Sequence, residues 1–126
     1  MSDDLAKRAV ACKGWQWMPG MATTDGERLL FEDRVMGWQA WSLDRRRHTL
    51  DSDPLPDLTD PATLGCVLAL VREAWEDPYM MTKYWRAPRI WTCKSDEVHP
   101  LLGGGRGIPK GKTEAAALVA ALEAAP

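Results

Sequence analysis

Residues 103–113, GGGRGIPKGKT, combine glycines, basic side chains and a threonine ahead of a helix-like segment, and such a combination can bind phosphate. The loop of nucleotide-hydrolysing proteins requires a glycine, four residues and then Gly-Lys-Ser/Thr, so that successive backbone N–H groups wrap the phosphates. That spacing requires a glycine at position 106, where Arg106 stands. The thirteen residues after Thr113 also leave no later strand for a magnesium-holding aspartate. The segment is therefore not a nucleotide-hydrolysis loop.

A simpler kind of anion binding stays open at this segment. A helix start presents unpaired N–H groups and a partial positive charge, which favour an exposed anion by about 0.3–1 kcal/mol. Arg106, Lys110 and Lys112 add positive charge there. We expect either a phosphate site that includes Thr113, or a connector in which Thr113 only caps the helix. Gly111 is expected to need a positive φ angle.

Seven tryptophans stand beside one phenylalanine and two tyrosines, so tryptophan is expected to fill much of the core. Trp85 and Trp91 are the best candidates for exposed indoles, because four basic residues interleave with them along the chain. A base ring stacked on an exposed indole gains about 1–3 kcal/mol. The interleaved basic residues are Lys83, Arg86, Arg89 and Lys94. The predicted ligand-binding residues are Trp85, Arg86, Arg89, Trp91, Arg106, Lys110, Lys112 and Thr113.

The remaining polar clusters do not predict catalysis or a metal site. Asp51, Asp53 and Asp57 resemble the start of a calcium loop, but its glycine and closing glutamate are missing at the required spacing. Neither histidine has a cysteine at zinc-ligand spacing. Cys93 and His99 would suit a nucleophile and its base, yet a cysteine in a strand is more often a small apolar filler. We expect no cofactor, no metal and no enzymatic activity.

The charges are segregated along the chain although the formal net charge is only −2. The segment from Asp51 to Pro78 holds seven acidic residues and one arginine, whereas the segment from Tyr79 to Thr113 holds seven basic and two acidic residues. Either the acidic helix region packs beside the basic strands, or the basic segment forms a face that receives an anion. The basic run at 44–48, DRRRH, is likewise either a solvated surface or a phosphate contact.

Length and composition predict one soluble domain over residues 1–126. A chain of this length buries a sizeable core without disulfides or metals. Its longest nearly uncharged apolar run, Ala62 to Val71, is too short to cross a bilayer. Three widely spaced cysteines and a start without a signal-like apolar stretch favour the cytoplasm, so we expect no membrane partner.

Three helices and several strands are expected to position these residues. The helices are predicted from Ser2 to about Lys13, from Asp60-Pro61 to Pro78, and from Thr113 to Ala124. GWQWM (14–18) and RLLFE (28–32) are expected to pair as a hairpin, followed by RVMGWQAWSL (34–43) as a third apolar stretch. YMMTKYW and RIWTCK flank Ala87-Pro88 as a second hairpin. Trp75 lies on the apolar stripe of the second helix and is expected in the core.

This order predicts an α+β fold. The expected architecture is one antiparallel sheet of four to five strands, from two hairpins, packed with three helices in the order α-β-β(β)-α-β-β-α. The strands come in adjacent pairs, which is not the pattern of a parallel nucleotide-binding sheet.

Two segments resemble stretches of small bacteriophage and prophage proteins of the phage α/β/α-sandwich type. They are LPDLTDPATLGCVLALVREAWEDP (55–78) and GKTEAAALVAALEAAP (111–126), about a third of the chain. The matching residues cap helices or face a core, so the resemblance implies a fold and transfers no catalytic residue. It also implies a phage origin and an action against host defence in the host cytosol.

Three functions therefore stay open. The first is sequestration of a nucleotide-like small molecule, without turnover, in a possible homo-oligomer. The second is inhibition of a host defence protein, as anti-CRISPR-like antagonists do, through the acidic segment 51–77, which would imitate a phosphate backbone. The third is single-stranded nucleic-acid binding through the basic, tryptophan-bearing face, against which a pI near 5.7 counts.

Overall fold

The structure is a computed structural model that describes residues 2–42, 47–49, 54–95 and 108–126. Within these residues the chain forms three helices and six strands, in the order α1, β1, β2, β3, α2, β4, β5, β6, α3. The helices are α1 (Ser2–Val10), α2 (Pro61–Ala74) and α3 (Glu114–Ala124). The strands are β1 (Arg28–Asp33), β2 (Gly37–Trp41), β3 (Arg47–Thr49), β4 (Met80–Trp85), β5 (Ile90–Ser95) and β6 (Lys110–Gly111).

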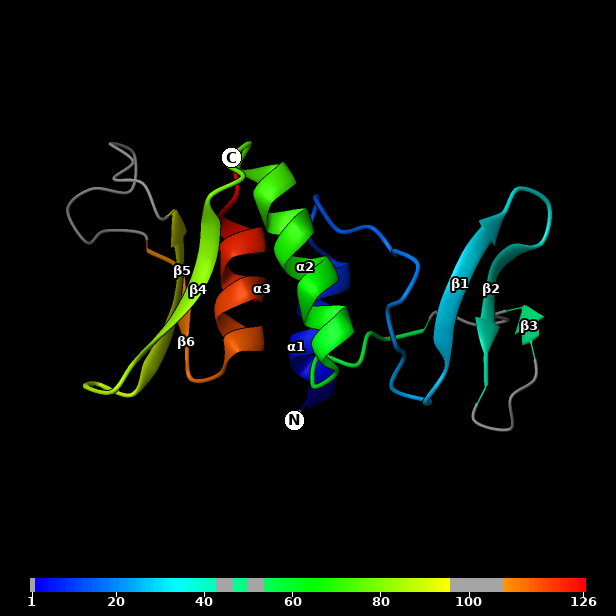
Figure 1. The fold of residues 1–126 in the computed structure, drawn as a ribbon, viewed down its shortest axis with the longest axis horizontal. Helices are drawn as coiled ribbons and strands as arrows, with labels where there is room; N and C mark the ends of the chain where they lie inside the picture. Colours follow the sequence, from blue (N-terminus) through cyan, green and yellow to red (C-terminus); the bar gives the residue numbers. More distant parts are fainter. Residues whose placement is uncertain (1, 43–46, 50–53, 96–107) are drawn as a thin grey trace.

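The α+β class is confirmed, but the strands form two separate antiparallel sheets instead of the single expected sheet. One sheet has the order β1-β2-β3 and the other the order β4-β5-β6. Figure 1 shows the reason: the three helices stand between the two sheets, so no strand of one can pair with a strand of the other. The β4-β5-β6 sheet lies against α3, while the β1-β2-β3 sheet stands off at the opposite end of the molecule.

The first hairpin differs from the prediction. GWQWM forms no strand, and Trp15 and Trp17 instead pack edge to face, with ring centroids 5.4 Å apart. β1 pairs with β2 around the turn at residues 34–36, with a bulge between Leu29 and Phe31. The indole N–H of Trp15 is buried and has no hydrogen-bond partner among the described residues. Edge-to-face packing of two indoles thus replaces the backbone pairing that the alternation predicts.

The helix starts follow the capping residues that the sequence predicts. Asp60 caps α2, because its carboxylate accepts a hydrogen bond from the backbone N–H of Thr63, and Pro61 occupies the first turn. Thr113 caps α3 in the same way through the N–H of Ala116, at 3.0 Å. Two helices end earlier than expected, α1 at Val10 and α2 at Ala74.

The core lies where α1, α2 and the inner face of the β4-β5-β6 sheet surround α3. Its buried members include Ala9, Val67, Met80, Cys93 and Leu118. Trp75 packs against this core as predicted, half-buried, and its indole N–H donates to the carbonyl of Ala121 at 2.8 Å. No helix in the described residues is long and apolar enough to cross a membrane.

Candidate ligand-binding surface

The β4-β5-β6 sheet has an inner face toward α3 and an outer face that no described element covers. Met80 and Cys93 are fully buried on the inner face, where the Thr82 hydroxyl also donates to the Glu114 carboxylate of α3. Since side chains alternate along a strand, the residues between them point outward. The outer face therefore carries Met81, Lys83, Trp85, Ile90, Thr92, Lys94 and Lys110.

The pairing register places two lysines in one row across this outer face. Lys83 on β4 lies opposite Thr92 on β5, and Thr92 lies opposite Lys110 on β6. Lys94 belongs to the neighbouring row, opposite Met81. No carboxylate of the described residues forms an ion pair with these lysines. The outer face thus presents three ammonium groups that are free to meet an anion.

Trp85 lies beside two of these three ammonium groups. The Lys83 ammonium lies 4.3 Å from the centroid of the indole, and the Lys94 ammonium lies 5.8 Å from it. The indole N–H donates to the Thr92 hydroxyl at 3.0 Å, which fixes the orientation of the ring. Cation–π attraction of about 0.5–1 kcal/mol at an exposed site offsets part of the repulsion between the two ammonium groups. The Trp85 ring therefore attracts both ammonium groups itself, without an intervening residue.

Trp91 does not share this face with Trp85. It lies opposite Tyr84 on the inner side, with ring centroids 5.4 Å apart, and packs against the core. The predicted pair of stacking indoles is therefore divided between the two faces. Tyr84 is the more exposed ring on the inner side, at 46%.

The other predicted ligand-binding residues lie around the edges of the outer face or beyond the described residues. Arg86 and Arg89 are exposed in the turn that joins β4 to β5. Lys112 is exposed between β6 and α3, and Thr113 is engaged as the cap of α3. Arg106 and the glycines at 103–105 lie outside the described residues.

Lys83, Thr92 and Lys94 form part of the outer face although they are not among the predicted ligand-binding residues. The alternation of side chains along β4 and β5 could have predicted this face. Lys83 and Trp85 are two positions apart on β4, Thr92 and Lys94 are two positions apart on β5, and the pairing of Lys83 with Thr92 puts all four on the same side. The register itself depends on where the turn falls, which the sequence does not specify to one residue.

Glycine is required at position 111 for a different reason from the predicted one. Gly111 does not adopt a positive φ, unlike Gly20, Gly26 and Gly37. A Cβ atom at position 111 would instead lie 2.5 Å from the Cβ of Ala116 and 2.8 Å from the backbone of α3. Glycine is needed here because β6 passes directly over the first turns of α3.

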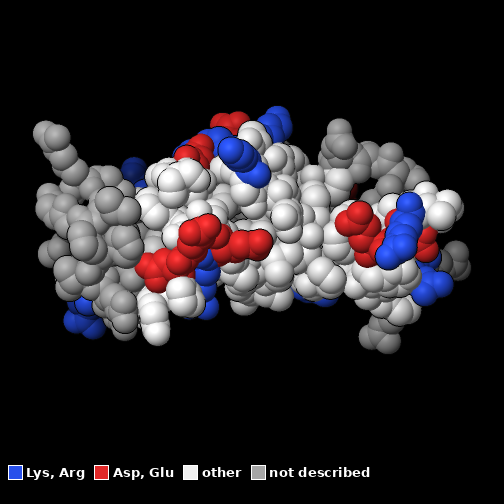
Figure 2. Space-filling view, turned by 90° about the horizontal axis from the view of Figure 1, so that it is seen from above, with Lys and Arg blue, Asp and Glu red and all other residues white. Residues whose placement is uncertain are grey.

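Three carboxylates of the acidic segment that would imitate a phosphate backbone are engaged in the fold. Asp57 accepts from both the N–H and the hydroxyl of Thr59, and Asp60 caps α2 and pairs with Arg28. Asp77 accepts from the N–H of Tyr79. Figure 2, seen from the end where α2 finishes, shows acidic side chains gathered over the middle of that face. Asp51 and Asp53 lie outside the described residues.

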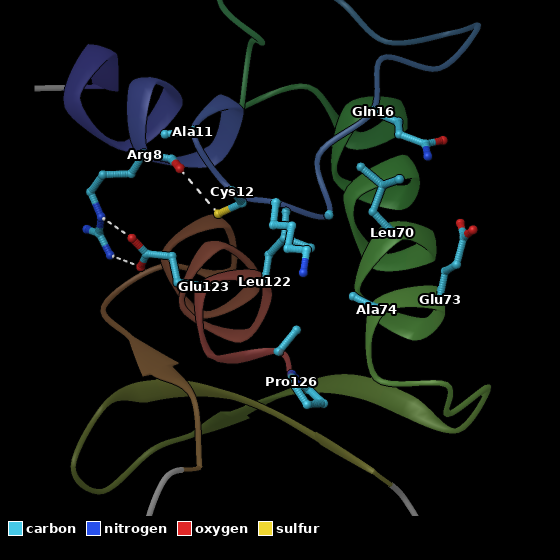
Figure 3. A pocket seen from close by; sticks show the side chains of 13 residues that line it. Arg8, Ala11, Cys12, Gln16, Leu70, Glu73, Ala74, Leu122, Glu123 and Pro126 are labelled. Atoms are coloured by element: carbon cyan, nitrogen blue, oxygen red, sulfur yellow. Dashed lines mark hydrogen bonds and ion pairs between the residues drawn. The ribbon is translucent and has the colours of Figure 1, made fainter.

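A second feature is an open pocket of about 620 Å³ between α1, α2 and the end of α3. Figure 3 shows Leu70, Ala74 and Leu122 in its interior, and the Arg8–Glu123 ion pair on one side. The Cys12 thiol lines it and donates to the Arg8 carbonyl, and burial raises the pKa of that thiol. The sequence patterns pointed to no residue of this pocket, because its members come from three distant segments.

The described residues bear on the predicted Cys93–His99 pair and on metal binding. Burial raises the pKa of the Cys93 thiol to about 11, so Cys93 stays protonated near neutral pH, and His99 lies outside the described residues. Among the residues that the structure describes, no three histidine, cysteine or carboxylate side chains gather as metal ligands.

A scan against models of protein families, a search of curated proteins and a search of solved structures each found no match for this chain. The resemblance to phage α/β/α-sandwich proteins therefore stays a prediction.

Proposed function

We propose that this protein binds a phosphate-bearing, nucleotide-type small molecule on the outer face of the β4-β5-β6 sheet, without chemical turnover. The observation that carries the proposal is a set of three lysines on one face with no carboxylate partner among the described residues: Lys83 and Lys94 beside the Trp85 ring, and Lys110 in the same row as Lys83. A phosphate satisfies several ammonium groups at once, because it offers three or four strong acceptor oxygens in a small volume.

The same face offers a place for the base of a nucleotide. Trp85 and Ile90 form an apolar row beside the row that holds Lys83 and Thr92. A base that stacks on Trp85 displaces the Lys83 ammonium from the ring toward the phosphate, so the two contacts form together. Stacking on an aromatic side chain is worth about 1–3 kcal/mol.

The phosphate is better placed at the lysines than at the start of α3. Glu114 already puts a carboxylate in the first turn of α3, and Thr113 satisfies the N–H of Ala116. A second anion at that helix start would meet the Glu114 charge. Lys112, Arg86 and Arg89 then extend the positive field around the sheet and do not form a separate site.

The biological setting belongs to the same proposal. A phage-encoded protein that sequesters a nucleotide signal of host immunity in the host cytosol would act by binding alone. A homo-oligomer would add a second wall to the open outer face and increase the buried area of the ligand.

The test is calorimetric titration of the protein with mononucleotides, linear and cyclic dinucleotides, and inorganic phosphate. We expect at least one nucleotide to bind and the paired variant Lys83→Ala/Lys110→Ala to bind it about 100-fold more weakly, at roughly tenfold for each charged contact. Lys7→Ala, which removes an exposed lysine from α1, is the matched control and should bind like the wild type. If no nucleotide of the panel binds, the proposal is overturned.

Single-stranded nucleic acid is the second candidate, and the row of lysines across the outer face favours it. Lys83 and Lys110 lie in one row across β4, β5 and β6, so a strand that crosses the sheet along this row would meet both lysines. In that case affinity for a short oligonucleotide should fall with salt, with a log–log slope of about −0.7 for each phosphate neutralised. A flat salt response would leave only the small-molecule ligand.

A further inference from the structure

The turn between β1 and β2 carries the most exposed apolar side chain of the described residues. Val35 is 89% exposed and its neighbour Met36 is 60% exposed, at the end of the sheet that stands away from the helices (Figure 1). Burying these two adjacent apolar side chains against another surface would be favourable.

The turn is held in one conformation. The Asp33 carboxylate accepts hydrogen bonds from the N–H groups of Val35 at 2.8 Å and Met36 at 3.0 Å. Gly37 closes the turn with a φ of 83°, a backbone angle that residues with a side chain rarely adopt. Val35 and Met36 are therefore presented as a preformed projection, called the tip below, and little conformational entropy is lost when it docks.

The pocket between α1, α2 and α3 combines an apolar interior with charged residues in its lining. Leu70, Ala74 and Leu122 lie in its interior, and the pocket has a volume of about 620 Å³. A volume of this size is typical of sites that accept several side chains or a small molecule.

The charges around the tip match those around the pocket. Arg34 is exposed beside Val35, and no described residue bonds to its side chain. Lys13 and Glu73 are exposed at the pocket, and the described residues provide no partner for either side chain. Each surface thus carries an exposed residue of either sign, Arg34 and Glu32 at the tip and Glu73 and Lys13 at the pocket, so opposite charges are available on both sides.

We propose that the tip of one copy of this chain docks in the helical pocket of a second copy. In Figure 1 the β1–β2 turn lies at the end of the molecule away from α1, α2 and α3, whose residues line the pocket, so a single molecule does not bring its own tip into its pocket. Two copies that exchange tips about a two-fold axis fill both pockets and close the assembly. This inference does not depend on the proposed function.

The experiment measures the mass of the full chain in solution by analytical ultracentrifugation. The contact between a tip and a pocket buries less area than a standard interface, and we therefore expect weak association. Protein concentrations in the experiment should extend to about 0.5 mM. We expect the wild type to reach the mass of a dimer. The tip variant Val35→Ser/Met36→Ser and the pocket variant Ala74→Arg should each remain monomeric, whereas Tyr79→Ser, an equally drastic change at an exposed side chain elsewhere, should still dimerise.

Mixing the two variants gives the decisive result. The tip variant keeps an intact pocket and the pocket variant keeps an intact tip, so an equimolar mixture should restore one contact and form a heterodimer. Ala11→Arg, at an exposed residue of the same pocket, replaces Ala74→Arg if the latter lowers the melting temperature. A monomeric wild type at the highest concentration, variants that still dimerise, or a mixture that fails to associate would each overturn the proposal.

Discussion

Trp85 shows how one side chain can prepare a surface for an anion. Its indole is fixed by a hydrogen bond to Thr92 and has two lysine ammonium groups over or beside the ring. Both lysines are thereby kept close together before any ligand arrives, so less side-chain entropy is lost when phosphate binds. Replacing the ring would lower affinity through the lysines as well as through lost stacking.

Gly111 gives the sharpest prediction about a single residue. Gly111→Ala brings a methyl group within 2.5 Å of the Ala116 Cβ and against the backbone of α3, and we expect such overpacking to destabilise the protein by about 1–3 kcal/mol. Thermal melts of the unliganded protein measure this effect.

Gly65→Ala is the matched control for that experiment. Gly65 lies within α2 and its added Cβ would meet nothing within 4 Å, so alanine there should stabilise the helix by about 0.5–1 kcal/mol. Equal melting temperatures for Gly111→Ala and the wild type would show that β6 does not press on α3 as described.

At the scale of elements, Asp60 joins α2 to the first sheet. Its carboxylate caps α2 and also pairs with the Arg28 guanidinium at the start of β1, at 2.9 Å. The hydrogen bond from Arg28 is the largest influence on this carboxyl and lowers its pKa to about 2. One side chain thus stabilises a helix start and anchors a sheet that otherwise stands apart.

Because the pKa of Asp60 is lower in the folded protein, its contribution to stability is present above pH about 4 and is lost as pH falls toward 2. Asp60→Asn keeps a good helix cap but removes the charge, so its stability should fall less steeply than that of the wild type across this window. Asp60→Ala should lose about 1 kcal/mol more, through the cap. Urea unfolding at several pH values measures these differences, and parallel pH profiles for wild type and Asp60→Asn would contradict the assignment.

Local signals in the sequence were enough for some elements and insufficient for others. Asp60, Pro61 and Thr113 predict the starts of α2 and α3, because capping depends on neighbours in the chain. The β4–β5 hairpin was also predicted from its flanking patterns. GWQWM was wrongly predicted as a strand, since Trp15 and Trp17 alternate for packing against each other and the helices.

The candidate surface was predicted only in part for the same reason. Trp85 and Lys110 lie on the outer face, whereas Trp91 lies on the inner one, and only the register of the strands distinguishes them. The helical pocket joins α1, α2 and the end of α3, and no periodic pattern reports contacts between segments so distant in sequence.

At the scale of the whole molecule, the helices separate two surfaces with different chemistry. The outer face of the β4-β5-β6 sheet carries lysines with no carboxylate partner among the described residues, and the β1-β2-β3 sheet at the other end carries exposed apolar side chains. In the dimer proposed above, the contact is made by the tip and the helical pocket, and neither contains a lysine of the outer face. Ligand binding and self-association should therefore be separable by substitution.

The central claim is that the lysines around Trp85 receive phosphate, and an NMR titration of labelled protein with ATP tests it most directly. We expect the indole N–H resonance of Trp85 and the amides of residues 81–85, 90–94 and 110–113 to shift together and saturate. The other indole resonances should stay in place, as should the amides of β1 and β2. No shift at ATP concentrations of several millimolar, or shifts that centre on the helical pocket, would contradict the assignment of this face as the binding surface.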